Sequence, residues 1–130
     1  MIPRSPRSLI LALIFVLFTA TAAAGQSMGA DLFRLYCAAC HGRDGGGHGP
    51  VAATMKIEPT DLTVLSIHNS GMFPGARVTA LLTGEISPAA HGSADMPVWG
   101  PIFTGLDDSA ARVKVRIANL VAYIESIQKK

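Results

Sequence analysis

Apolar residues recur at three- and four-residue steps most clearly in the last part of this 130-residue chain. Their positions there are Val113, Ile117, Leu120, Val121, Ile124 and Ile127. Residues 107–109 read Asp-Asp-Ser, which suits the start of a helix, and the two lysines at 129–130 suit its end. The pattern therefore predicts one amphipathic helix over about 109–128.

Shorter helices are predicted earlier in the chain. Residues 27–36 carry an apolar stripe at helical spacing. Thr60 follows a proline and is a plausible N-cap for a second short helix, which would contain Leu62 and Leu65. Residues 76–82 form a third candidate, which Gly84 would close.

Two long segments, Gly42–Pro50 and Ser87–Pro101, are rich in glycine and proline and are predicted to be loops. No stretch alternates apolar and polar residues between hairpin turns, so a β architecture is not expected. The chain is predicted to be all-α. Loops this long are unusual in a compact domain unless they wrap around something.

The first 24 residues have the pattern of a secretory signal peptide: a basic start, a short apolar run and small residues at the end. Cleavage is expected after Ala24, and cleavage after Ala22 fits almost as well. The alternative is an uncleaved membrane anchor. The apolar run Leu9–Ala24 has 16 residues, fewer than the roughly 20 needed to span a bilayer. The expected organisation is a leader over 1–24 and one domain over 25–130, periplasmic or otherwise exported.

Charge gives no indication of a nucleic-acid or lipid partner. The full chain has 11 basic and 9 acidic residues. Arg4 and Arg7 belong to the leader, so nine residues of each sign remain after cleavage. A balanced charge predicts neither nucleic-acid binding nor attraction to an anionic membrane. Membrane attachment is expected only if the leader stays uncleaved.

The two cysteines belong to the sequence Cys37-Ala38-Ala39-Cys40-His41. A disulfide between residues three apart would close too short a loop to add much stability. Cys-x-x-Cys-His is instead the signal for covalent attachment of one c-type haem. Residues three apart share a helix face, so both sulfurs can form thioethers with one macrocycle. The adjacent His41 can then bind the iron as its proximal ligand.

Two other interpretations of the cysteines are weaker. A thioredoxin-like Cys-x-x-Cys motif belongs after a strand in a βαβ unit, and no strand is predicted before Cys37. A zinc site needs a second pair of ligands at a compatible spacing. The remaining histidines, His48, His68 and His91, are scattered and unpaired.

A haem that transfers electrons needs a second axial ligand, and methionine or histidine would serve. Met96 is the favoured candidate because Pro97 stiffens its loop just before the last helix. Met72 and a histidine, His91 or His68, remain open. Two further methionines are less suited: Met28 precedes the first helix, and Met55 follows His41 too closely to reach the far face of the ring.

The chain resembles the class I cytochromes c, specifically the bacterial monohaem type with a Met-Pro-x-Trp-Gly ligand loop. The resemblance covers essentially all of the chain after the leader. The matching segments appear in the family's order: Gly29 to Phe33, Cys37 to His41, Gly49-Pro50, Pro59 to Leu62, Met96 to Gly100 and Leu120 to Tyr123.

The resemblance implies a cytochrome c fold, with three to five helices and long loops around one covalent haem. It implies that His41 and Met96 are the axial ligands and that the Pro50 carbonyl accepts a hydrogen bond from His41. Trp99 would pack by the haem edge, where its N–H would reach a propionate, and Arg77 is a further candidate propionate partner. The crossing of the first and last helices would be formed by Gly29, Phe33, Leu120 and Tyr123.

These expectations describe a one-electron carrier rather than an enzyme, because no residue is placed for acid–base or nucleophilic chemistry. The chain would exchange electrons with donor and acceptor proteins that the sequence does not identify. Two alternatives are a dedicated haem subunit of a periplasmic oxidoreductase and a haem enzyme or gas sensor with a labile sixth ligand.

Overall fold

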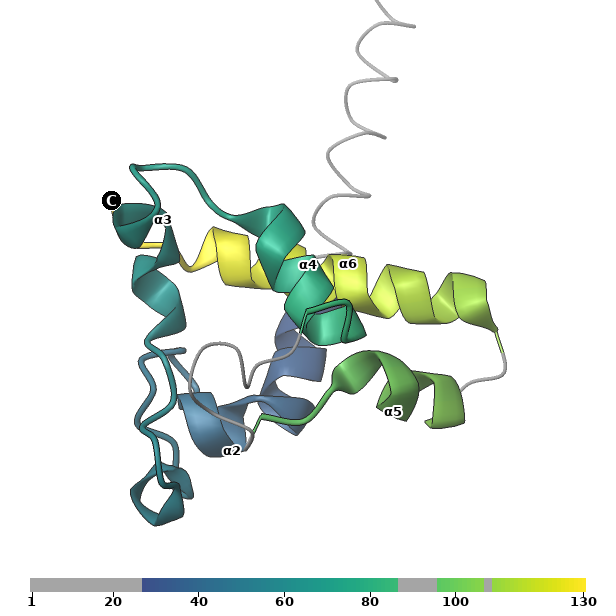
Figure 1. Ribbon diagram of the computed structural model, residues 1–130, viewed down its shortest axis with the longest axis horizontal. Coiled ribbons are helices and arrows are strands. Elements are labelled where there is room, and N and C mark those ends of the chain that lie inside the picture. Colours follow the sequence, from purple (N-terminus) through teal and green to yellow (C-terminus); the bar gives the residue numbers. More distant parts are fainter. Residues whose placement is uncertain (1–26, 87–95, 107–108) are drawn as a thin grey trace, which may run out of the picture.

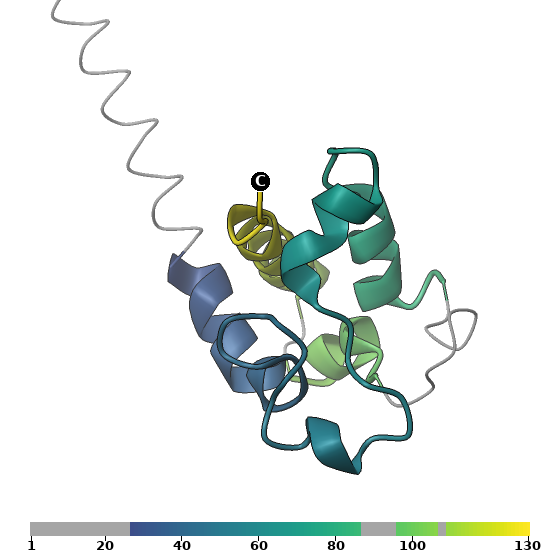
Figure 2. The ribbon, with the colours of Figure 1, turned by 90° about the vertical axis from the view of Figure 1, so that its left-hand side faces the viewer.

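The computed structural model describes residues 27–86, 96–106 and 109–130 (Figures 1 and 2). The predicted leader, His91 and the acidic pair at 107–108 lie outside the described residues. Within these ranges the chain is helical and contains no strand, which confirms the all-α prediction.

The elements follow one another along the chain without repeats. After a helix over 27–36 they are α2 (Ala38–His41), η1 (Ala52–Thr54), η2 (Leu62–Val64), α3 (Leu65–His68), α4 (Gly75–Thr83), α5 (Trp99–Leu106) and α6 (Ala110–Ser126). Four helices in the described ranges exceed two turns: 27–36, α4, α5 and α6.

Helix α6 forms as the periodicity predicts. The Ser109 side chain accepts a hydrogen bond from the Arg112 backbone N–H at 3.4 Å, which caps the first turn. The buried positions of the helix are Val113, Ile117, Leu120 and Ile124. The helix therefore turns a single apolar stripe toward the core.

Two details of the sequence prediction are wrong. Asp61, not Thr60, caps the short helical segment, because its carboxylate accepts the Thr63 N–H at 2.8 Å. Residues 99–101 are not loop but the first turn of α5. Pro101 is compatible with that turn because the first N–H groups of a helix have no partner inside the helix. The Gly-Pro pair therefore begins a helix here, rather than interrupting one.

The helix over 27–36 crosses α6 at very short range (Figure 2). A Cβ on Gly29 would lie 2.1 Å from the Asn119 carbonyl oxygen and 2.9 Å from Tyr123 Cβ. Phe33 is fully buried there, and its ring centroid lies 5.2 Å from that of Tyr123. Only glycine allows this approach, which confirms the expected crossing of the two helices.

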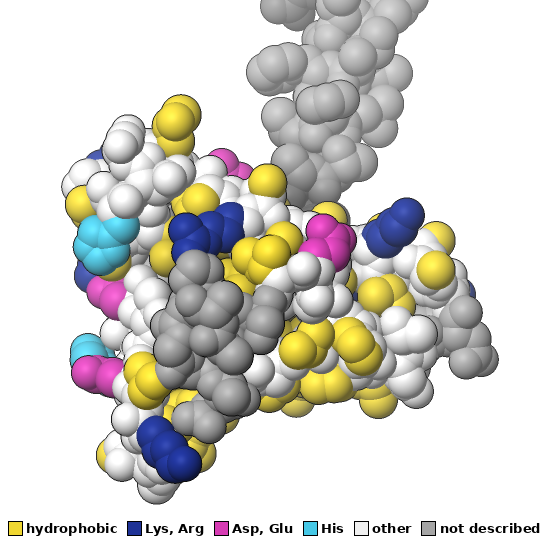
Figure 3. Space-filling view, viewed as in Figure 1, with side chains coloured by type: hydrophobic (Ala, Val, Ile, Leu, Met, Phe, Trp, Pro, Cys, Tyr) yellow, Lys and Arg dark blue, Asp and Glu magenta, His cyan; other side chains and the backbone are white. Residues whose placement is uncertain are grey.

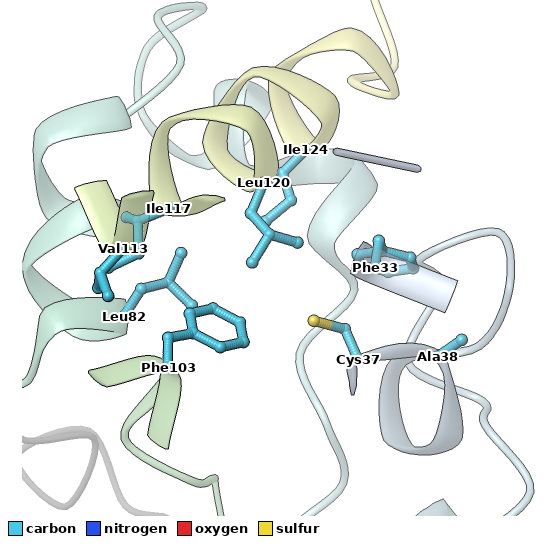
Figure 4. Packing of buried hydrophobic residues seen from close by; sticks show 9 residues of the cluster. All are labelled: Phe33, Cys37, Ala38, Leu82, Phe103, Val113, Ile117, Leu120 and Ile124. Atoms are coloured by element: carbon cyan, nitrogen blue, oxygen red, sulfur yellow. The ribbon is translucent and has the colours of Figure 1, made fainter. Parts of the chain in front are cut away.

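The core lies between that crossing and the pair α4 and α5, both of which pack against α6 (Figure 4). Leu82 of α4 and Phe103 of α5 meet Val113 and Ile117 on one side of Leu120. Phe33 and Cys37 lie on the other side. The core therefore reaches from the far end of α6 to the Cys-x-x-Cys-His segment.

Candidate functional site

The segment 37–41 forms one helical turn directly after the 27–36 helix. The Cys37 N–H donates to the Phe33 carbonyl at 2.8 Å, so the turn continues from the crossing helix. The His41 N–H donates to the Cys37 carbonyl at 2.9 Å. Cys37 and Cys40 are both free thiols. They occupy one turn, as the expected double attachment requires.

This turn borders a cavity of about 390 Å³, which lies within the size range of small-molecule and cofactor sites. Its wall is mostly apolar. The predicted site residues on the wall are Cys37, Cys40, His41, Met96 and Trp99. Residues that are up to 62 positions apart in the sequence are thus brought to one internal surface.

The imidazole of His41 is held by the backbone of another segment. Its Nδ1 lies 3.0 Å from the Thr60 carbonyl oxygen. A carbonyl only accepts hydrogen bonds, so Nδ1 carries the proton and Nε2 keeps its lone pair. Burial lowers the pKa of His41, although the Thr60 bond opposes that shift. The ring is therefore neutral near pH 7, the form that binds a metal.

Burial acts on the first thiol in the same direction, against the charged form. Cys37 has an exposed fraction of 8%. Its pKa is raised to about 12, first by burial and then by the neighbouring Cys40. Figure 4 shows its sulfur directed into the interior, on the side of Leu120 and Phe103. Near neutral pH this thiol is protonated and protected from reagents in solution.

Pro50 does not occupy its expected position. The acceptor for His41 Nδ1 is the Thr60 carbonyl, and Pro50 lines a separate surface hollow on the outer side of α2. The reason is the fold of the loop over 42–50. Gly49 N–H donates to Cys40 O at 2.9 Å and Val51 N–H to Ala39 O at 3.1 Å. These bonds hold residues 49–51 against the backbone of α2, away from the imidazole.

The segment that contains Met96 is positioned by the end of α4. Gly84 has a φ of +84°, and a Cβ there would lie 2.5 Å from Val98 Cγ1. A Cβ on Gly100 would lie 2.8 Å from the Thr83 carbonyl oxygen. Two glycines thus allow residues 98–100 to pack tightly on α4. This packing holds the preceding Met96 and Pro97 at the cavity wall.

Trp99 belongs to a cluster of three aromatic rings. Its ring centroid lies 5.3 Å from that of Tyr36 and 5.7 Å from that of Phe103, and Tyr36 and Phe103 are 5.2 Å apart. Tilted and edge-on contacts at these distances are favourable. The three rings join the 27–36 helix to α5, and those of Tyr36 and Trp99 line the cavity. A role of the Trp99 N–H toward a propionate stays a prediction.

The other candidate axial ligands fall into two groups. Met72 and Met28 are exposed, by 69% and 50%, and do not line the cavity. Met55 and His68 do line it. Met55 was disfavoured only because it follows His41 too closely to reach the far side of a ring. Of the ligand candidates left open by the sequence, Met96 and His68 line the cavity. Met96 stays the favoured prediction.

Several wall residues were not predicted from the sequence. Thr60 acts through its backbone, so no side-chain pattern could have indicated its role. Tyr36 was predicted only as part of the 27–36 helix, and it also lines the cavity. Arg77, the other candidate propionate partner, does line the cavity.

The surface seen in Figure 3 carries apolar side chains over α5, while lysine and arginine side chains are spread singly.

Among the described residues, no three His, Cys, Asp or Glu side chains gather as a metal site would require. The second ligand pair of a zinc site is therefore not found in these ranges. No helix in the same ranges has the length and apolar character needed to cross a bilayer.

Comparison of the chain with protein-family models, with curated proteins and with solved structures finds no match in any of the three. The residues of the cavity are therefore the basis for inferring the function of the chain.

Proposed function

We propose that this chain is an exported one-electron carrier of the class I cytochrome c type. Cys37 and Cys40 would hold one haem covalently, and His41 and Met96 would be its axial ligands. One observation carries the proposal: two thiols on one helical turn, a neutral imidazole and a thioether line the same cavity. Covalent attachment of one haem with two axial ligands would use all four groups together.

The protonation state of His41 and the apolar lining of the cavity both suit a haem. The bond from His41 Nδ1 to the Thr60 carbonyl leaves Nε2 available and makes the imidazole a stronger donor to a metal. Tyr36 and Trp99, which pack on the fully buried Phe103, contribute apolar surface to the cavity. When bound, the haem would supply an iron couple that changes by one electron, with a potential raised by a methionine ligand.

We also propose the cytochrome c fold as the finer description of this all-α chain. A haem would fill the 390 Å³ cavity and contribute apolar core to a small domain. It would also give the long glycine- and proline-rich loops an object to enclose. The tight helix crossing at Gly29 fits the same proposal.

Mass spectrometry of the protein from its native envelope fraction tests the attachment and the leader together. The expected mass is that of residues 25–130 plus one haem, and a Cys40→Ala variant should show a weakened attachment. A mass without haem, in cells that attach c-type haem to a control protein, would overturn the proposal. A mass that retains residues 1–24 would change it to an anchored carrier.

Optical spectra separate the carrier from a haem enzyme or sensor. Ferric haem with a methionine ligand shows a weak charge-transfer band at the red edge of the visible spectrum. We expect this band in the oxidised protein and expect Met96→Ala to abolish it. If the band is absent from the parent protein, the sixth position is open or held by another ligand, and the assignment of Met96 as axial ligand is wrong.

Size-exclusion chromatography of native extract distinguishes a free carrier from a dedicated subunit. A free carrier should elute as a small protein. Elution in a stoichiometric complex with an oxidoreductase would support the subunit alternative instead.

A further inference from the structure

The segment 60–66 contributes the carbonyl that holds His41, yet it has little structure of its own. It consists of Thr60, the cap residue Asp61, the three-residue turn η2 and the start of α3, which spans only four residues. Isolated turns of this length are not stable in water. The position of the Thr60 carbonyl therefore depends on contacts that the segment makes with the rest of the chain.

The Leu62 N–H donates to the Gly45 carbonyl at 2.8 Å, and Leu62 and Leu65 pack against the core. Three further hydrogen bonds come from the two residues that follow α6 and its C-cap. The Gln128 side chain donates through Nε2 to the Leu62 carbonyl at 2.6 Å and accepts the Ser66 N–H through Oε1 at 2.9 Å. The Lys129 backbone N–H donates to the Thr63 carbonyl at 2.7 Å. We call these three bonds the 128–129 clamp.

The clamp is itself anchored to α6. Gln128 Nε2 also donates to the Ile124 carbonyl at 2.8 Å, so its amide group is fixed on the last turn of the helix. Ile124 is buried in the core and also lines the cavity. The amide group thus joins the most regular helix of the chain to one of its least regular segments.

We propose that Gln128 is a positioning residue for the proximal histidine: through Leu62 and Ser66 it fixes the Thr60 carbonyl and thereby the imidazole of His41. Leu62 is two residues from Thr60, and the intervening Asp61 is held by its own bonds to Thr63. A shift of Leu62 is therefore transmitted to the Thr60 carbonyl. In its redox consequence, this inference rests on the proposed function.

Gln128→Met tests the clamp because methionine matches the length of glutamine and cannot form the amide bonds to Leu62, Ser66 and Ile124. The backbone bond of Lys129 stays available to the variant. The readout is the His41 Nδ1 proton in protein labelled with ¹⁵N-histidine. We expect this proton to exchange with solvent roughly tenfold faster in the variant, the effect of weakening one hydrogen bond. In the haem-loaded protein the reduction potential should also rise, because a weaker Nδ1–H bond makes the imidazole a poorer donor to Fe(III).

Two control variants separate positioning from stability. Val113→Ala removes buried methyl groups near the opposite end of α6 and should destabilise the fold without changing the His41 signal. Ser126→Ala removes an exposed hydrogen bond to the Tyr123 carbonyl next to the clamp and should change neither. If Gln128→Met matches Val113→Ala in both readouts, Gln128 is only structural and the proposal is wrong.

The outcomes also distinguish this proposal from the proposed function. Covalent haem is established on the parent protein by mass alone. The His41 ring can be followed with or without haem. A haem-free protein in which Gln128→Met still accelerates the exchange would overturn the electron-carrier function and keep the clamp. A haem-loaded protein in which Gln128→Met leaves the exchange rate unchanged would overturn the clamp and keep the electron-carrier function.

Discussion

The crossing of the 27–36 helix with α6 and the walls of the cavity are held together by different kinds of contact. At the crossing, Gly29 brings two regular backbones into contact, and Phe33 and Leu120 are fully buried. The cavity wall is assembled from single turns and loop residues such as Met55, Thr60 and Met96. Direct packing holds the crossing together, whereas hydrogen bonds from distant residues hold much of the wall.

Because the two regions are held by different contacts, the residues that determine stability and the residues that determine the site's properties are largely different. A helix crossing needs only complementary surfaces, and its two elements are stable enough to supply them. A site that holds a group with donors from several directions needs chain segments that pass around that group, and such segments seldom form long helices. We therefore expect substitutions at the crossing to change the free energy of unfolding most. Substitutions at the wall should change the properties of the site.

The largest expected effect is that of Gly29→Ala. The added Cβ would lie 2.1 Å from the Asn119 carbonyl oxygen, so the helices must separate. We expect a loss of about 3 kcal/mol in the free energy of unfolding, measured by chemical denaturation. Gly105→Ala in α5 is the matched control, because nothing lies within 4 Å of its Cβ position. That control should gain about 0.5 kcal/mol, and equal stability of the two variants would contradict the proposed packing.

Met96→Ala should lower stability less than Gly29→Ala does. Its main effect should be on the reduction potential of the site. Met96 is half-buried at the cavity wall, and its truncation should cost about 2 kcal/mol. The reduction potential should fall, because a thioether ligand favours Fe(II). Potentiometry and denaturation of Met72→Ala provide the control, since Met72 is 69% exposed and lies off the cavity. A fall in potential in the Met72 variant instead would reassign the ligand.

Asp61→Ala should have the smallest effect, and that effect should depend on pH. The hydrogen bonds from Thr63, and then the charge of Lys129, lower the pKa of Asp61. Its contribution is therefore present above the unfolded-state pKa near 4 and is lost as the pH falls through the lower folded-state value. At pH 7 we expect a loss of about 1 kcal/mol, the usual effect of an N-cap.

Denaturation curves at several pH values test this prediction. The difference between the parent protein and Asp61→Ala should shrink as the pH falls below about 4. Asp61→Asn keeps an acceptor oxygen without the charge, so it should retain part of the cap and show a weaker pH dependence. A difference between parent and Asp61→Ala that stays constant from pH 7 to pH 3 would show that the charge of Asp61 has no part in the cap.

The predictions from sequence were best where one local rule decided the outcome. The periodic stripe and Ser109 define α6, and Gly84 closes α4 in the left-handed conformation as expected. Trp99-Gly100-Pro101 was assigned to a loop, because glycine and proline usually interrupt a helix. The structure begins α5 there, since the missing N–H of proline costs nothing in a first turn.

The sequence by itself determined the chemistry of this protein: which thiols, imidazole and thioethers the chain carries, and which stretches form long helices. Local spacing is enough to place the two thiols together, because residues three apart share a helix face wherever the helix lies. Only the tertiary structure decided which backbone carbonyl holds His41. Every residue offers a carbonyl, so the choice of Thr60 over Pro50 depends on how the 42–50 loop folds onto α2 and how Gln128 holds the segment beside it.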